Sequence, residues 1–145
     1  MPKGIVSAAI TIDVPFFDVD VMRIVWHGHY VKYFEMARCE LLNKIDYNYN
    51  QMEISGVAWP VTDIRLQYVN SAQFGQKIEV TATLVEYDMR LKINYEIRDI
   101  ISGKRLTKGY TVQVAVDIET KELQFETPQI LLDKLKDYIP ANNND

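Results

Sequence analysis

Apart from the residues that can form a folded core, the sequence has few features that stabilise a protein or direct it to a membrane or out of the cell. Its one cysteine, Cys39, excludes an intrachain disulfide and a cysteine-based zinc cluster. No run approaches the roughly 18–20 apolar residues that a membrane-spanning helix needs. No secretory signal is visible, because the apolar stretch after Lys3 is short and Asp13 soon interrupts it. These absences predict a reduced, cytoplasmic protein that does not insert into a membrane.

Positive charge is also in the minority. The 16 Lys and Arg residues are outnumbered by 20 Asp and Glu residues, which gives a formal net charge of −4. Broad nucleic-acid binding needs a positive field around the phosphates, so nucleic acid is excluded as a partner. Internal repeats and Pro/Gly/Ser-rich linkers are missing too. We therefore expect a single domain over residues 1–140, followed by a polar, frayed tail at 141–145.

The hydrophobic pattern changes its period along the chain. Apolar residues recur at helical spacing over residues 29–45 and form a wide apolar arc, which predicts a deeply packed helix. A closing helix is predicted over 127–138, with Thr127 as its N-cap and Pro128 in its first position. Stretches rich in β-branched and aromatic residues predict strands at 5–14, 61–69, 77–87, 91–99 and 106–117. Because only a curved antiparallel sheet could cover the long helix, the fold class is α+β.

The most unusual stretch, residues 16–30, joins the first strand to the long helix and contains Asp18 and Asp20. The first amides of a helix lack intrahelical partners and carry partial positive charge, so they can hold a developing oxyanion. A carboxylate one short loop upstream can fold back toward them. This combination suits thioester cleavage, in which Asp20 attacks the carbonyl carbon or removes a proton from an attacking water. Asp18 is expected to be structural.

The candidate residues also have simpler, non-catalytic interpretations. An Asp before a helix most often only hydrogen-bonds the backbone of a turn. The pair His27 and His29 suggests no metal site, because residues two apart do not share a helix face and no third ligand is evident. Cys39 is expected to be a packing residue, and Arg90 a solvated strand charge.

The motif around these carboxylates resembles a known family. Asp18-Val19-Asp20, then Val25-Trp26-His27-Gly28-His29-Tyr30, and then Tyr33-Phe34-Glu35-Met36-Ala37-Arg38 are similar to the signature of hot-dog-fold acyl-coenzyme A thioesterases. The most similar group is the 4-hydroxybenzoyl-coenzyme A thioesterase-like one, which includes thioesterases associated with the Tol-Pal cluster. The resemblance spans about residues 8–118 and is weaker at 74–80.

The resemblance implies a five-stranded antiparallel sheet wrapped around a long central helix. It assigns the catalytic carboxylate to Asp20, the carbonyl-polarising backbone amide to the neighbourhood of His27, and a contact with coenzyme A phosphates to Arg90. We take Trp26, His29 and Trp59 as further candidate substrate-binding residues. No cofactor is implied, since coenzyme A is part of the substrate. The family assembles as a dimer or a dimer of dimers, with active sites at the subunit interface.

Two positions depart from the family pattern. Arg23 stands where the family commonly has Gly, and Gln76 replaces the usual Asp. If the loop needs a positive φ at position 23, Arg23 is strained. Two other functions stay open: a hydroxyacyl thioester dehydratase or hydratase on the same fold, and a non-catalytic acyl-coenzyme A binding protein. The spacing from Asp20 to His27 and the lack of an Asn-Pro pair disfavour the dehydratase.

Overall fold

The computed structural model describes residues 4–139, so the frayed tail expected at 141–145 lies outside the described residues. Three α-helices, one short 3-10 helix and seven strands follow one another along this part of the chain. In order they are β1 (Val6–Asp13), η1 (Phe16–Asp18), α1 (His29–Lys44), α2 (Tyr49–Ile54), β2 (Val57–Ala58), β3 (Val61–Tyr68), β4 (Lys77–Glu86), β5 (Arg90–Asp99), β6 (Arg105–Val114), β7 (Val116–Asp117) and α3 (Gln129–Leu135).

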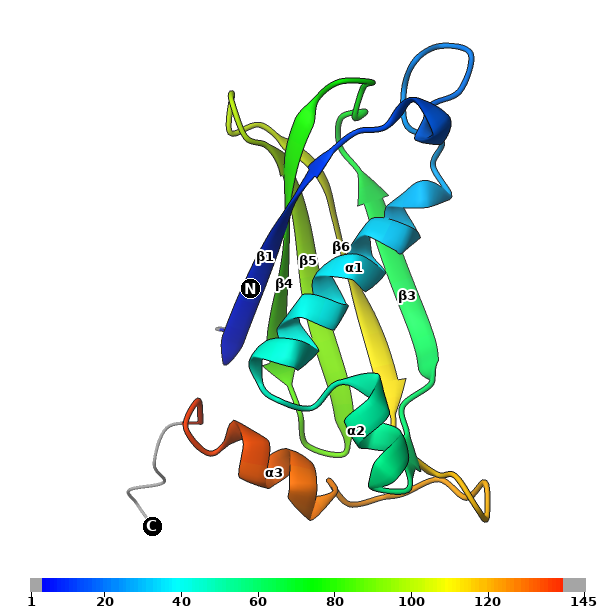
Figure 1. The fold of residues 1–145 in the computed structure, drawn as a ribbon, viewed down its shortest axis with the longest axis vertical. Coiled ribbons are helices and arrows are strands. Elements are labelled where there is room, and N and C mark those ends of the chain that lie inside the picture. The colour runs from blue at the N-terminus through cyan, green and yellow to red at the C-terminus, as the bar shows by residue number, and fades with distance from the viewer. Residues whose placement is uncertain (1–3, 140–145) are drawn as a thin grey trace.

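Five strands form one antiparallel sheet in the order β1-β4-β5-β6-β3, and α1 lies across one face of it (Figure 1). β2 and β7 pair separately near α2. This arrangement confirms the predicted α+β hot-dog architecture, with the long helix inside the curve of the sheet. No helix within residues 4–139 has the length and apolar character needed to cross a membrane.

The core lies between α1 and the sheet because both elements present an apolar face there. One face of α1 is buried, and alternate residues of β4 and β5 point toward it, as the two-residue period of a strand requires. The buried side chains are Tyr30, Tyr33, Phe34, Ala37, Leu41 and Leu42 from the helix, and Ile78, Val80, Ala82, Leu84, Leu91, Ile93, Tyr95 and Ile97 from the strands.

The sheet ends in two edge strands, β1 and β3. Within the described residues, strand β3 pairs only with β6, and all but one of its eight residues are exposed, including Val61, Ile64 and Tyr68. An exposed edge strand with apolar side chains is a template for pairing with another chain.

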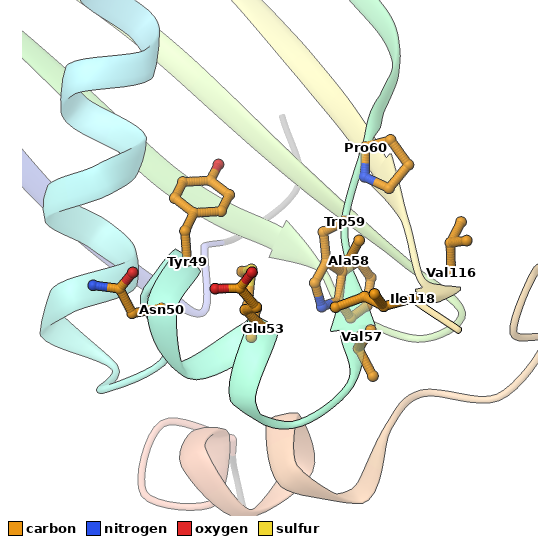
Figure 2. A pocket seen from close by; sticks show the side chains of 10 residues that line it. Tyr49, Asn50, Glu53, Val57, Ala58, Trp59, Pro60, Val116 and Ile118 are labelled. Carbon is orange, nitrogen blue, oxygen red and sulfur yellow. The ribbon is translucent and has the colours of Figure 1, made fainter. Parts of the chain in front are cut away.

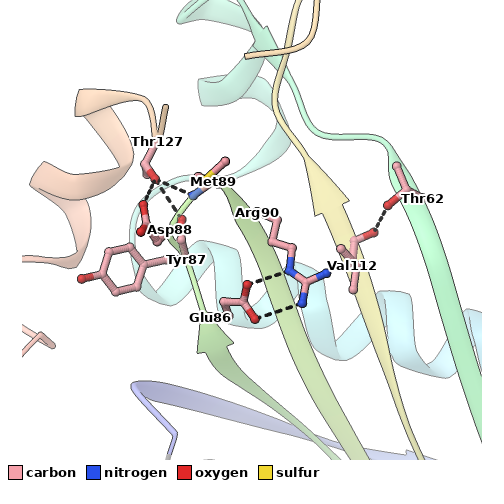
Figure 3. Close-up of polar contacts among 8 residues, drawn as sticks. All are labelled: Thr62, Glu86, Tyr87, Asp88, Met89, Arg90, Val112 and Thr127. Carbon is pink, nitrogen blue, oxygen red and sulfur yellow. Dashed lines mark hydrogen bonds and ion pairs between the residues drawn. The ribbon is translucent and has the colours of Figure 1, made fainter. Parts of the chain in front are cut away.

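Several predicted boundaries need correction. The closing helix begins at Gln129, and Pro128 is its N-cap, so Thr127 does not cap it. Instead, the Thr127 hydroxyl accepts a hydrogen bond from the Met89 backbone N–H at 2.9 Å and contacts the Tyr87 carbonyl at 3.2 Å, which ties this segment to the β4–β5 turn (Figure 3). The predicted strand over 106–117 is interrupted at Ala115 and becomes β6 and β7.

Candidate functional site

The two carboxylates of the Asp-x-Asp motif lie in opposite environments. Asp18 is 3% exposed, accepts hydrogen bonds from the Tyr33 hydroxyl at 2.6 Å and the Lys32 ammonium at 2.7 Å, and lies 3.8 Å from His29 Nε2. Burial raises the pKa of the Asp18 carboxyl, but the hydrogen bonds from Lys32 and Tyr33 outweigh burial and hold the pKa below its ordinary value. Asp18 is thus an ionised anchor between the loop and α1, as the structural interpretation expected.

Asp20 is exposed and closes a tight turn. Its backbone carbonyl accepts from the Arg23 N–H at 2.9 Å, its own N–H donates to the Ile24 carbonyl at 2.9 Å, and its side chain accepts from the Met22 N–H at 2.8 Å. A short Asp side chain typically hydrogen-bonds the backbone two residues on in this way. Asp20 therefore hydrogen-bonds the backbone of its own turn, as the simpler interpretation predicted. This contact uses one of its two carboxylate oxygens.

Arg23 occupies the position where the turn needs a left-handed backbone. Its φ is +66°, so the strain expected from the missing glycine is present. A turn followed by one left-handed residue is a common way to join two short antiparallel segments, and here Val19 and Val25 form the flanking bridge. The Arg23 guanidinium lies 5.2 Å from the centre of the Phe74 ring, a contact that favours this conformation.

The start of α1 carries the predicted oxyanion-binding amides. The helix begins at His29 with Gly28 as its N-cap. Within residues 4–139, the backbone N–H groups of His27 and Gly28 donate to no backbone carbonyl, whereas the His29 N–H donates to the Trp26 carbonyl at 2.9 Å. The Trp26 ring covers this turn so closely that a Cβ on Gly28 would lie 2.1 Å from it. A side chain at position 28 would therefore require the Trp26 ring to move.

The three predicted residues at the helix start form one aromatic cluster. The Trp26 ring centre lies 4.9 Å from that of His27 and 5.4 Å from that of His29. The Tyr68 hydroxyl donates to the His27 carbonyl at 2.9 Å and so ties the end of β3 to the helix start. Among the described residues His27 has no carboxylate partner; the His–carboxylate pair is instead His29 with Asp18. The paired histidine and acid of a dehydratase are thus not found at His27.

Trp59 lies at the other end of the molecule from Asp20. Its indole N–H donates to the Tyr47 hydroxyl at 3.0 Å, and its ring lines an open pocket of about 550 Å³ beside α2. Figure 2 shows Tyr49, Asn50 and Glu53 on one side of this pocket and Trp59, Pro60 and Ile118 on the other. The β1–α1 loop and α2 lie at opposite ends of α1 (Figure 1), so within one chain this pocket does not face Asp20.

Arg90, the candidate for phosphate binding, begins β5 and is exposed. Its guanidinium forms two hydrogen bonds with the Glu86 carboxylate, at 2.6 and 3.3 Å (Figure 3). The pair is on the surface, where the ion pair is worth little and salt screens it. A phosphate group would have to compete with Glu86 for this cation.

The sequence argument overlooked one polar group that reaches into the core. Arg38 is 7% exposed, its Nε donates to the Tyr49 hydroxyl at 2.8 Å, and its Nη1 donates to the Tyr95 hydroxyl at 3.3 Å. Burial lowers the pKa of Arg38, but the phenol oxygens of Tyr95 and Tyr49 outweigh burial and keep the guanidinium charged. The position of Arg38 on the apolar side of the predicted helix, four residues after Phe34 and three before Leu41, was the available signal.

Comparisons with known proteins find relatives that match most of the chain. The family model described as the thioesterase-like superfamily matches residues 14–135. YneP of Bacillus subtilis (strain 168), which is named as a candidate acyl-CoA thioesterase, is 29% identical over 116 residues, covering 79% of this chain and 83% of YneP.

Solved structures share the same fold. The DHNA-CoA thioesterase of Staphylococcus aureus superposes with a TM-score of 0.80 at 26% identity, covering 91% of this chain and 88% of that one. The 1,4-dihydroxy-2-naphthoyl-CoA thioesterase of Synechocystis superposes with a TM-score of 0.79 at 18% identity, covering 91% of this chain and 97% of that one.

Proposed function

Because this chain belongs to the thioesterase-like superfamily, we propose that it hydrolyses the thioester bond of an acyl-CoA, with Asp20 as the chemical carboxylate. The observation that carries the proposal is the family match over residues 14–135, which includes the whole segment from the Asp-x-Asp motif through α1. Both coenzyme A and a carrier protein are compatible acyl carriers, and the relative's name favours coenzyme A.

Asp20 could catalyse the hydrolysis by two mechanisms. In the first, the carboxylate takes a proton from water, hydroxide adds to the thioester carbonyl, and the tetrahedral intermediate expels the thiolate, which is then protonated. In the second, the carboxylate itself adds, the thiolate leaves, and water hydrolyses the resulting anhydride. In both, the N–H groups of His27 and Gly28 are the proposed donors to the oxyanion, and one good donor of this kind contributes about 2.7–4 kcal/mol.

The exposure of Asp20 in a single chain supports a site that a second copy completes. We propose a homodimer in which two β3 edges pair antiparallel. Tyr68 at the end of β3 is tied to the His27 carbonyl, whereas Trp59 and Pro60 precede the start of β3. An antiparallel pairing would therefore bring the partner's Trp59 pocket beside this chain's Asp20. That placement gives Trp59 its substrate-binding role, with the acyl group in the partner's pocket.

The deciding variant is Asp20→Asn, assayed with acyl-CoA esters and a thiol-trapping reagent. We expect kcat to fall at least roughly 100-fold, the lower end of what a general base contributes, with an unchanged thermal midpoint. Asp137→Asn, an exposed carboxylate at the end of the described chain, is the matched control and should keep full activity. Unaltered turnover in Asp20→Asn would remove Asp20 from the chemistry.

Single-turnover hydrolysis in H₂¹⁸O separates the two routes. If Asp20 is the nucleophile and water opens the anhydride at the Asp20 carbonyl, ¹⁸O enters the Asp20 carboxylate and is detected by mass spectrometry of the peptide; if water opens it at the acyl carbonyl, the anhydride is detected instead as acylated Asp20 in the rapidly quenched protein. If Asp20 is the base, the label appears only in the released acid.

A further inference from the structure

The Tyr68 hydroxyl holds one end of the peptide group that joins His27 to Gly28. It donates a 2.9 Å hydrogen bond to the His27 carbonyl oxygen, where β3 ends beside the start of α1 (Figure 1). At the other end of the same peptide group, the Gly28 N–H has no hydrogen-bond acceptor within residues 4–139. The oxygen of this peptide is therefore occupied by a side chain from β3, and its N–H is available to a ligand.

Two ring contacts keep the Tyr68 hydroxyl in this place. The Tyr68 ring meets the Tyr30 ring edge-to-face, with 5.2 Å between ring centres, and meets the His27 ring in the same way at 6.4 Å. Tyr30 is buried, and its hydroxyl accepts from the Ala72 N–H at 3.1 Å, so this neighbour is itself anchored. The backbone of Tyr68 is held by the pairing of β3 with β6. Packing therefore directs the hydroxyl at the His27 carbonyl.

A hydrogen bond accepted by a peptide oxygen strengthens the donor at the other end of the same group. The C–N bond has partial double-bond character, so electron density drawn toward the oxygen leaves the nitrogen. Hydrogen bonds linked in this way strengthen one another by about 10–30% per bond. Water can also donate to the His27 oxygen at this half-exposed position, but it is a less acidic donor than a phenol.

The same bond fixes a direction. In a trans peptide the N–H points away from the carbonyl oxygen, so a restrained His27 carbonyl also restrains the Gly28 N–H. A donor whose direction is set before the reaction needs no reorganisation when charge develops on its acceptor. Tyr68 therefore makes the Gly28 N–H both a stronger donor and a better-directed one.

We propose that Tyr68 is a positioning residue for thioester cleavage: its hydroxyl polarises and directs the Gly28 N–H, which then holds the thioester oxygen more strongly as that oxygen gains negative charge. The proposal rests on the proposed hydrolysis and deepens it, since Tyr68 acts through the peptide and not on the reacting atoms. Because β3 is also the edge proposed to pair with a second copy, order in this strand and the strength of the oxyanion donor become linked.

Tyr68→Phe tests the proposal, because it keeps the ring contacts and removes only the hydroxyl. One oxyanion donor is worth about 10²–10³ in kcat, so a change of about 10–30% in its strength should lower kcat for benzoyl-CoA or hexanoyl-CoA about 2–8-fold. KM and the thermal midpoint should stay unchanged, since this donor acts mainly on the transition state. A loss of packing alone would instead lower the thermal midpoint or raise KM.

A graded replacement tests the same idea in the other direction. Replacing Tyr68 by 3-fluorotyrosine supplies a more acidic phenol of nearly the same size, and at about pH 6 this phenol stays protonated. We expect kcat to rise in the order phenylalanine, tyrosine, 3-fluorotyrosine at position 68. Tyr110→Phe is the matched control: Tyr110 lies on β6 with its ring beneath Lys92, and its hydroxyl should not affect kcat.

The polarisation itself is measured by ¹³C NMR of benzoyl-CoA labelled at the thioester carbonyl. The ester is bound to protein that carries Asp20→Asn, so that it persists. Stronger donation to the carbonyl moves its resonance downfield on binding, and we expect a smaller downfield shift when Tyr68→Phe is added. Equal shifts with and without the Tyr68 hydroxyl, or a kcat that does not follow the order of the three side chains, overturn the proposal.

The two measurements separate this proposal from the function on which it rests. If no ester releases thiol but the shift of the bound carbonyl depends on Tyr68, the hydrolytic function fails and the Gly28 donor directed by Tyr68 stands. If the esters are hydrolysed and kcat does not depend on Tyr68, the function stands and the positioning role fails.

Discussion

The Asp18 carboxylate accepts a 2.6 Å hydrogen bond from the Tyr33 hydroxyl, and this bond fixes the β1–α1 loop to the first turns of α1. The two residues are 15 positions apart, and both side chains are buried. Asp18 also accepts from Lys32. The loop that carries Asp20 is therefore held at one end by an ionised group inside the protein, so its conformation depends on the protonation of Asp18.

Acid should weaken this anchor. The pKa of Asp18 in the folded protein lies below its ordinary value, so its contribution to stability is complete above the unfolded pKa, about 3.9, and is lost as pH falls through the folded pKa. Asp18→Asn should lower the free energy of unfolding by about 1–3 kcal/mol at pH 7. The difference in unfolding free energy between wild type and variant, measured by urea denaturation, should shrink below pH 4. A constant difference from pH 7 to pH 3 would contradict the anchor, and Asp137→Asn should show no effect at either pH.

Position 23 should tolerate glycine and reject β-branched residues. Arg23→Gly relieves a positive φ but loses the Phe74 contact and adds chain entropy to the unfolded state, so we expect a change in unfolding free energy below about 1 kcal/mol. Arg23→Val should destabilise by about 1–3 kcal/mol, because a β-branched residue strongly disfavours that backbone region. Thermal melts of the two variants provide the comparison, and equal melting points would argue against a strained turn.

Arg90 can bind a coenzyme A phosphate only when its ion pair with Glu86 is broken, so the effect of Arg90 on KM should depend on Glu86. Arg90→Ala is expected to raise KM for acyl-CoA about 2–5-fold at low salt with kcat little changed, the size of a surface ion-pair effect. Glu86→Gln removes the competing carboxylate and should lower KM. Arg98→Ala, which breaks a similar surface pair with Glu96, is the control and should leave KM unchanged. If Arg90→Ala and Glu86→Gln both leave KM unchanged, Arg90 does not contact the coenzyme.

Assembly through β3 should be sensitive to charge at its exposed edge. Size-exclusion chromatography with light scattering should give a mass that is a multiple of the 16.9 kDa chain. Ile64→Lys, in the middle of β3, should shift the protein toward the monomer and lower activity in parallel. Ile101→Lys, at an exposed position in the β5–β6 turn, should do neither. A fully active monomer would exclude a site shared between copies.

The sequence was sufficient for the elements whose periodicity is long and regular. The helix at 29–45 and four of the five sheet strands were predicted to within one residue, because their apolar and β-branched residues recur over several turns or pleats; the prediction for β6 ran past its end at Val114. Helix α2 was missed because six residues show too little periodicity. Its N-terminus could have been predicted from Asn48 and Gln51, which have the spacing of a capping box. In the structure each of these side chains accepts a hydrogen bond from the other residue's backbone N–H.

The site was harder to predict because its distances depend on tertiary structure. The turn at Asp20 and the strain at Arg23 follow from local rules, and both were anticipated. The contact between Arg38 and Tyr49 joins two helices, and no spacing in the sequence indicates that a buried guanidinium will face phenols and not a carboxylate. The position of Trp59, far from Asp20 in its own chain, likewise depends on the path of β3.

The strand order also has a consequence for synthesis. β1 lies beside β4, so Val6 pairs with Leu84, and residues 77–84 must emerge from the ribosome before β1 finds its neighbour. Until then the apolar side of α1 has no sheet to cover it. Pairings so distant along the chain are slow to form, so the sheet should assemble only after β4 has been translated.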